Sequence, residues 1–134
     1  MSIGIGCPNC GTDGFAEAFP CPACGHYRMG RLRICRDGAL LSVIAVHTTV
    51  GRALLRKWVG DADAQFAQNS QYAFVPTEGL GWVIVSHPGC RNPTFVDGSQ
   101  IEPDRPVQLL SGMSVTVGTS RARVDVEIDR SVIQ

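Results

Sequence analysis

Four of the six cysteines in this chain of 134 residues lie in two Cys-x-x-Cys turns near its N-terminus. Such a turn places two thiolates on one side of a tight loop. Two facing loops complete a tetrahedral site with metal–sulfur distances of about 2.3 Å. A glycine follows each turn, so backbone N–H groups can bend toward the sulfurs without a side chain in the way. The spacing predicts a metal site formed by Cys7, Cys10, Cys21 and Cys24.

Zinc is the metal that four thiolates in this spacing favour, and rubredoxin-type iron is the alternative. Two disulfides would use the same cysteines, but they require an oxidising compartment that nothing in the sequence indicates. Four protein ligands leave no open coordination position, so the Zn²⁺ is expected to be structural. We expect residues 1–29 to form a small zinc ribbon in which metal binding and folding are one event.

The composition predicts a soluble, cytoplasmic protein. The formal net charge is zero, and four thiolates on one Zn²⁺ would make it negative, so bulk attraction to nucleic acid is not expected. Residues 1–6 have neither a basic start nor the apolar stretch of a signal peptide, and the longest apolar run, residues 39–46, is too short to span a membrane. Residues 30–134 are sufficient for one compact domain.

Beyond residue 30 the sequence predicts β structure almost throughout. Residues 31–35 alternate polar and apolar side chains, Asp37-Gly38 is a turn signal, and residues 40–50 are rich in β-branched side chains, which together predict a hairpin. Further strands are predicted over residues 82–85, 94–96, 107–110, 114–117 and 124–128. Short strands with frequent turns indicate an all-β sandwich of mostly antiparallel strands.

Three further segments connect the predicted strands. Asp97-Gly98 is a type I′ turn signal, and Ser111-Gly112 joins the strands predicted on either side of it. Residues 54–68 do not fit the β pattern. Within them, Asp61 could cap a short helix, or the whole segment could be a long loop.

Three short segments follow one another along the predicted sandwich: Val50-Gly51-Arg52, then residues 92–98, then the alternation of residues 110–118 that ends in glycine. In their order and spacing they resemble the forkhead-associated (FHA) domain, a phosphothreonine-binding β-sandwich. The resemblance extends from about residue 31 to residue 128. It implies an FHA-like sandwich that is preceded here by the zinc ribbon.

The sequence departs from the FHA pattern where the family has Ser-Arg-x-His-Ala. Aligned on the alanine, Asn69 stands at the serine, Ser70 at the arginine and Tyr72 at the histidine. A shifted alignment puts Ser70 at the serine and Gln71 at the arginine. The second arginine and the histidine are absent in both. A glycine and an asparagine of the later motifs are also replaced, by Pro93 and Asp97.

The resemblance implies a phosphopeptide site in the loops. Arg52 carries over as a phosphate ligand and Asn92 as a ligand of the peptide backbone, while Asn69 or Ser70 can donate one hydrogen bond. Loss of one charge-assisted hydrogen bond weakens binding about tenfold to a hundredfold, and Arg91, or Arg56 and Lys57 in the loop after Arg52, could restore the charge. The predicted partner-binding residues are Arg52, Asn69, Ser70, Arg91, Asn92 and Thr94.

We therefore expect a non-catalytic adaptor that binds a protein partner, through phosphothreonine if Arg52 and its neighbours suffice. The resemblance implies partners such as serine/threonine kinases or their substrates, commonly in bacteria. One alternative is a phosphate-independent scaffold subunit of a larger complex. Another is nucleic-acid binding by the zinc ribbon and an arginine stripe at positions 28, 31, 33 and 36. Cys90 lies three residues after His87 and could pair with it as nucleophile and base. Nothing in the sequence indicates an oxyanion hole, so we expect no enzymatic activity.

Overall fold

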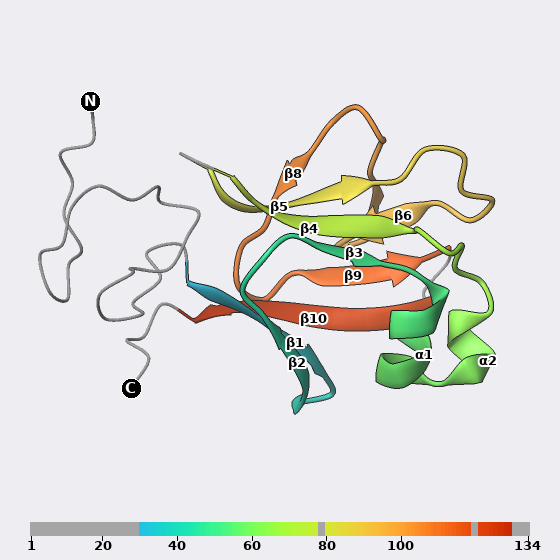
Figure 1. Ribbon diagram of the computed structural model, residues 1–134, viewed down its shortest axis with the longest axis horizontal. Helices are drawn as coiled ribbons and strands as arrows, with labels where there is room; N and C mark the ends of the chain where they lie inside the picture. Colours follow the sequence, from blue (N-terminus) through green and yellow to red (C-terminus); the bar gives the residue numbers. More distant parts are fainter. Residues whose placement is uncertain (1–29, 78–79, 119–120, 130–134) are drawn as a thin grey trace, which may run out of the picture.

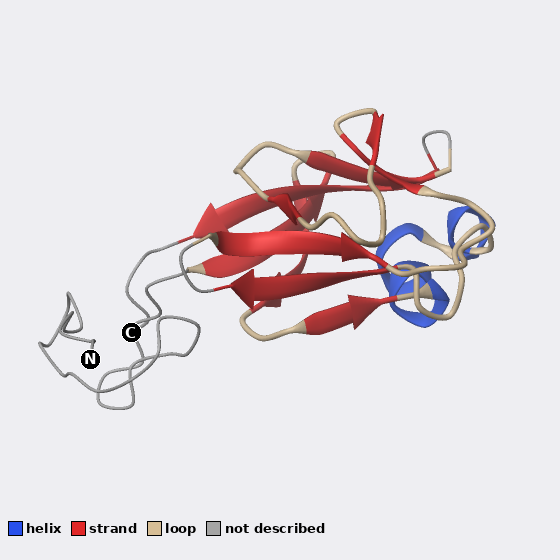
Figure 2. Ribbon diagram, turned by 90° about the horizontal axis from the view of Figure 1, so that it is seen from above, coloured by secondary structure: helices blue, strands red, loops and turns tan. Residues whose placement is uncertain are grey.

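The computed structural model describes residues 30–77, 80–118 and 121–129, except for the side chain of residue 121. Two antiparallel sheets lie face to face as a β-sandwich, and two short helices lie together at one end of it (Figures 1 and 2). The predicted all-β sandwich is confirmed for this part of the chain.

The larger sheet has six strands in the order β2-β1-β10-β9-β6-β7. In chain order these strands are β1 (Arg31–Arg36), β2 (Ala39–Ile44), β6 (Thr94–Val96), β7 (Ser99–Gln100), β9 (Ser114–Val117) and β10 (Arg121–Asp129). Two hairpin turns of this sheet have the same backbone form. Asp37-Gly38 and Asp97-Gly98 have positive φ at both positions, as a type I′ turn requires.

The smaller sheet has four strands in the order β3-β4-β5-β8. They are β3 (Thr48–Val50), β4 (Tyr72–Thr77), β5 (Gly81–Ser86) and β8 (Val107–Gln108). β4 was not among the predicted strands, although it pairs with β5 over six residue pairs. The predicted strand at residues 107–110 is shorter than expected. Ser111-Gly112 leads from one sheet to the other, since β8 and β9 belong to different sheets.

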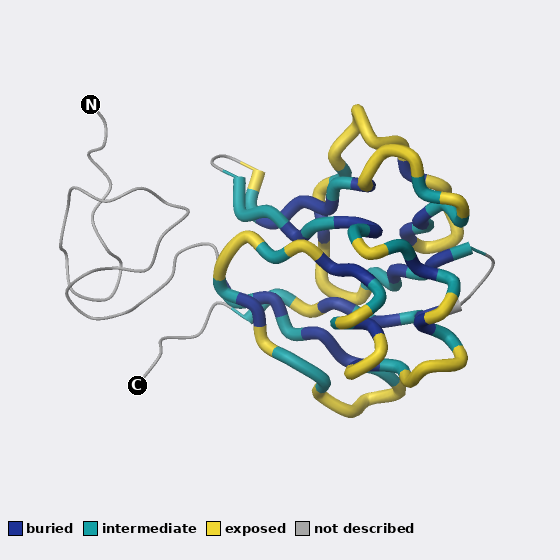
Figure 3. Tube along the Cα trace, turned by 45° about the vertical axis from the view of Figure 1, so that its right-hand side comes forward, coloured by how far each residue is buried: buried dark blue, intermediate teal, exposed yellow. Residues whose placement is uncertain are grey.

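The core lies between the sheets and is built from inward-facing residues of the longer strands (Figure 3). Leu32 and Ile34 face inward from the larger sheet, and Tyr72, Phe74 and Trp82 from the smaller one. Burial of a large apolar side chain contributes about 1.5 to 3 kcal/mol, so these strands supply much of the stability. The rings of Tyr72 and Phe74 meet edge to face, with centroids 5.3 Å apart.

The predicted hairpin of residues 31–50 is only half correct. β1 and β2 form it, but β2 ends at Ile44 and residues 45–47 cross to the other sheet, where β3 begins at Thr48. The Thr48 hydroxyl donates to the carbonyl of Val46 at this crossing, over 2.9 Å. No glycine or proline interrupts the sequence there, so the two strands look like one.

The segment that did not fit the β pattern forms two helices, α1 (Arg52–Val59) and α2 (Asp61–Ala64). α1 buries Leu55 and Trp58, which are three residues apart and therefore share one face. Of the alternatives for this segment, the short helix at Asp61 is correct for α2, but Gly60 occupies its cap position. The long loop is wrong for residues 52–59.

No helix in the described part of the chain is long and apolar enough to cross a membrane.

Candidate functional site

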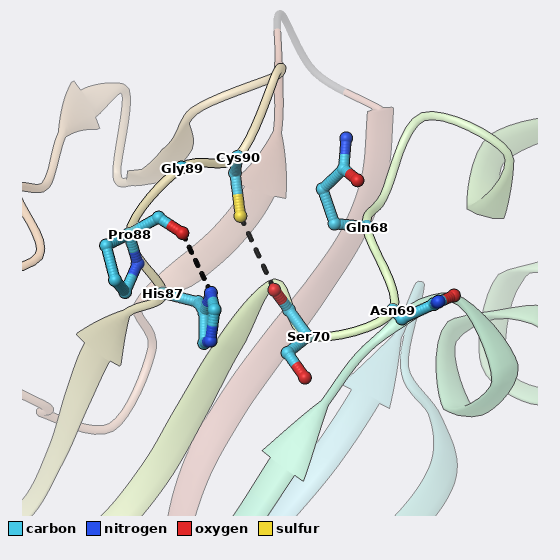
Figure 4. A pocket seen from close by; sticks show the side chains of 7 residues that line it. All are labelled: Gln68, Asn69, Ser70, His87, Pro88, Gly89 and Cys90. Atoms are coloured by element: carbon cyan, nitrogen blue, oxygen red, sulfur yellow. Dashed lines mark hydrogen bonds between the residues drawn. The ribbon is translucent and has the colours of Figure 1, made fainter.

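The candidate site lies at the helical end of the sandwich, where the chain enters β4 and where it connects β5 to β6 (Figure 1). These two segments enclose an open pocket of about 260 Å³. Figure 4 shows His87 and Cys90 on one wall and Gln68 and Ser70 on the other. The pocket is lined by Gln68, Asn69, Ser70, His87, Pro88, Gly89 and Cys90.

The chain leaving β3 and the chain entering β4 are in direct backbone contact. The Arg52 N–H donates to the carbonyl of Gln68, and the Gln71 N–H donates to the carbonyl of Val50, each over 2.9 Å. A Cβ atom on Gly51 would lie 1.8 Å from the carbonyl oxygen of Asn69. The glycine of the Gly-Arg motif is therefore required by this close approach and not by its φ of −138°, which is extended.

Gln71 is the residue that joins the loops, and its side chain is fully buried. Its Oε1 accepts from the N–H of Gln68 over 3.0 Å. Its Nε2 donates to the carbonyl of Asn92 over 2.7 Å and to the hydroxyl of Thr94 over 3.0 Å. The first contact holds the segment before β4 in shape, and the other two join this segment to the start of β6 and the residues before it. In the shifted alignment Gln71 stands at the position of the phosphate-binding arginine, but its burial does not allow contact with a phosphate.

Arg52 and Asn92 donate to two consecutive carbonyls of the chain between α2 and β4. The Arg52 Nε donates to Ala67 over 3.0 Å, and the Asn92 Nδ2 donates to Phe66 over 2.9 Å. A guanidinium has five N–H donors. Only the Nε donor of Arg52 is hydrogen-bonded within the described residues, so its terminal nitrogens keep four donors for an anion.

The remaining predicted site residues differ in their exposure. Asn69 is exposed, Ser70 is half-buried, and Arg91 is exposed directly after Cys90. The side chain of Asn69 points away from His87 and Cys90 (Figure 4). Thr94 is fully buried against Gln71, so its place in the structure is to support the loops and not to touch a partner.

The two basic residues proposed to replace the missing arginine have a different setting from the one expected. Arg56 and Lys57 lie on α1 and not in a loop. The Arg56 guanidinium forms an ion pair with Asp61 over 2.7 Å. Arg56 therefore already has a carboxylate beside it, whereas Arg91 directly follows Cys90 in the pocket lining.

The pocket lining contains polar groups but no carboxylate. Amide, hydroxyl and imidazole groups from Asn69, Ser70 and His87 are available, and Arg52 is held one residue from the lining at Ala67. Hydrogen-bond donors beside a fixed guanidinium suit an anion, since charge-assisted hydrogen bonds are about twice as strong as neutral ones.

Cys90 and His87 do not form a nucleophile–base pair. The Cys90 thiol donates to the carbonyl of Ser70 over 3.4 Å, and the Nδ1 of His87 lies 2.9 Å from the carbonyl of Pro88 (Figure 4). Partial burial raises the pKa of the Cys90 thiol. A reactive cysteine needs a lowered pKa, so this arrangement disfavours the thiolate.

The arginine stripe is largely occupied by ion pairs. Arg33 lies 3.8 Å from Glu127, and Arg36 lies 3.3 Å from Asp63. These carboxylates reduce the positive charge that a nucleic-acid surface would need. Arg28 lies outside the described residues.

The predicted zinc ribbon at residues 1–29 also lies outside the described residues, together with its four cysteine ligands. Within the described part of the chain, no group of three or more His, Cys, Asp or Glu side chains could hold a metal ion. Cys35 and Cys90 are free thiols, and Cys35 is buried in β1.

Comparison with known proteins identifies the fold. No family model matches the sequence, and no curated protein matches it. Solved structures with the same architecture are FHA domains. The described sandwich therefore has an FHA-like fold, as the motifs at Gly51-Arg52 and Asn92 implied.

Three solved structures illustrate the likeness. The FHA domain of an Arabidopsis thaliana hypothetical protein has a TM-score of 0.57 and 19% identity, over 78% of this chain and 91% of that one. The FHA domain of TbPar42 has a TM-score of 0.53 and 23% identity, over 87% and 63%. The MEK1 FHA domain has a TM-score of 0.50 and 14% identity, over 76% and 91%.

Proposed function

We propose that this protein is a non-catalytic binding module that recognises a phosphothreonine-containing segment of a partner protein with the loop end of its sandwich. The observation that carries the proposal is the setting of Arg52. Its Nε is fixed on the carbonyl of Ala67, the residue before the pocket-lining Gln68, and its four terminal N–H donors have no partner among the described residues. A fixed guanidinium binds a phosphate with little loss of side-chain freedom.

Binding through this site is expected to be weak for a single peptide. The arginine that the FHA pattern places next to its serine is absent, and Ser70 stands there instead. One missing charge-assisted hydrogen bond, at about 1.5 to 3 kcal/mol, lowers the affinity about tenfold to a hundredfold. Arg91 is exposed and directly follows the pocket-lining Cys90, so it is the candidate to supply part of the lost charge.

The test is binding of the zinc-loaded protein to a library of phosphothreonine peptides and their unphosphorylated twins. We expect binding only to the phosphorylated set, with a loss of at least about tenfold in Arg52→Ala, the factor that one charged hydrogen bond represents. Arg52→Lys keeps the charge without the Nε contact to Ala67 and should bind at an intermediate level.

Arg33→Ala is the matched control because it removes an arginine from β1, in the sheet opposite β4 and β5, that pairs only loosely with Glu127. It should leave binding unchanged, and a thermal melt of each variant separates lost binding from lost folding. Equal binding to both peptide sets would reject phosphate recognition. The phosphate-independent scaffold would then be the better function.

We further propose that Cys7, Cys10, Cys21 and Cys24 bind one structural Zn²⁺. Four thiolates in this spacing fit the metal and a reducing compartment such as the cytoplasm. Metal analysis should give one zinc per chain in the wild type and in Cys90→Ser, but none in Cys7→Ser/Cys24→Ser. Chelation should expose residues 1–29 to proteolysis, and unchanged proteolysis after complete zinc removal would contradict this.

A further inference from the structure

Among the described residues, β2 is a sheet edge without a neighbouring strand, and it is the longest of the four edges. The described strands at the other three sheet edges, β3, β7 and β8, have three, two and two residues, whereas β2 has six. Its residues, from Ala39 to Ile44, include no charge and no proline. Natural proteins usually protect an edge with charges, prolines or short strands, because its free N–H and C=O groups can pair with another strand.

A β-bulge places the two large exposed apolar side chains of β2 on one face. Arg33 pairs with Val43, but after the bulge Cys35 pairs with Leu40, so one extra residue of β2 is inserted between them. Arg33 and Cys35 lie on the same face of β1, and their partners Val43 and Leu40 therefore share that face as well. Leu40 is 49% exposed and Val43 is 43% exposed.

This arrangement is self-complementary. An antiparallel pairing of two β2 strands about a two-fold axis can set Leu40 of each copy opposite Val43 of the other. The four side chains then form one apolar cluster on the same face of a continuous sheet. A strand of different sequence would match this pattern only by chance, whereas a second copy of the chain matches it by symmetry.

Charge does not oppose the pairing. β2 itself is uncharged, and the nearest arginines in β1 have partners of their own in Glu127 and Asp63. The two β1 strands of a pair would be three strand spacings apart, about 14 Å at about 4.8 Å each. This exceeds the Debye length of about 8 Å at physiological salt, so repulsion between them is largely screened.

We propose that β2 pairs antiparallel with β2 of a second copy of this chain, joining two six-stranded sheets across a two-fold axis. The dimer carries two loop sites, one at the helical end of each copy. If the proposed phosphothreonine function holds, a partner with two phosphothreonines would bind with an avidity gain of about 10² to 10⁴ over one site. Such a gain offsets the weakness of the single site, but the dimer itself does not depend on that function.

The test is the molar mass of the full-length, zinc-loaded protein in solution, measured by light scattering and by sedimentation over a wide range of concentration. We expect twice the 14.4 kDa of one chain for the wild type. Val43→Lys and Leu40→Lys each place a charge opposite an apolar side chain of the other copy, twice in the dimer, and should give the mass of one chain. Leu110→Lys changes a residue that is 57% exposed outside both sheets and should remain dimeric.

Amide hydrogen exchange locates the contact. N–H groups of β2 should exchange slowly in the wild type and in Leu110→Lys, and faster in Val43→Lys. A wild-type mass of one chain at every concentration would overturn the proposal, as would dimers that persist in both β2 variants. Because mass and exchange are measured without peptide, their outcome is separate from that of the phosphopeptide test.

Discussion

Replacement of Gln71 by methionine tests whether this residue holds the candidate site together. The side chain makes three hydrogen bonds while fully buried, one from the N–H of Gln68 and two to Asn92 and Thr94. Methionine has nearly the same length but none of these donors and acceptors. The carbonyl of Asn92 and the N–H of Gln68 would be left without this partner in a partly buried setting.

The expected cost follows from the number of contacts. A typical net contribution is about 1 kcal/mol per hydrogen bond, and a buried group left without its partner costs about 1 to 3 kcal/mol. Burial of the thioether returns part of this. We expect Gln71→Met to lower the free energy of unfolding by about 2 to 4 kcal/mol, and to weaken phosphopeptide binding because Asn92 and Ser70 lose their fixed positions.

Urea denaturation followed by tryptophan fluorescence measures the change in stability. Gln65→Met is the matched control, since the Gln65 amide is exposed and donates only to Ala62 in its own helical turn. An exposed substitution of this kind changes stability by less than about 0.5 kcal/mol. If Gln71→Met is no more destabilising than Gln65→Met, the loops are held by their backbone contacts and the role assigned to Gln71 is wrong.

Two further predictions concern buried atoms beside the site. The hydroxyl of Tyr72 is buried and has no hydrogen-bond partner in the described structure, so Tyr72→Phe should raise the free energy of unfolding by about 1 kcal/mol. Desolvation raises the pKa of the buried Tyr72 hydroxyl, so the unfolded chain loses this proton first, and the free energy of unfolding falls as the pH rises above the ordinary tyrosine pKa of about 10. Urea titrations on both sides of that pH should show a smaller loss in Tyr72→Phe. Equal losses would contradict the assignment. Gly51→Ala would bring a Cβ to 1.8 Å from the Asn69 carbonyl and should cost at least about 2 kcal/mol by overpacking, and an unchanged melting temperature would show that the loops can separate freely.

The strands could be predicted wherever local alternation matched burial. β1, β5 and β9 follow their sequence pattern closely, because each alternates between the core and the outside or is bounded by turn residues. α1 was missed because its start carries no sequence signal. Gly51 occupies the cap position without a side-chain hydrogen bond, and only two of the eight residues of α1 are buried.

The sequence named residues of the candidate site but not the contacts among them. The resemblance located Arg52 and Asn92, and the structure brings them to adjacent carbonyls of one loop. The roles of Gln71 and Thr94 depend on a contact between residues 23 positions apart. Nothing in the local sequence distinguishes a buried glutamine that joins two loops from an exposed one, so this part of the site needed the fold.

The pairing of β1 with β10 has a mechanical consequence. Arg31 and Asp129 are opposite each other at the end of the sandwich away from the helices (Figure 1). Hydrogen bonds in an antiparallel pair run across the strands, so tension applied through residues 31 and 129 would peel the pair open one residue pair at a time. The loops around Arg52 lie at the far end of this path and would stay folded until the last pairs part. A partner bound there would therefore keep its site while the strands at the opposite end separate first.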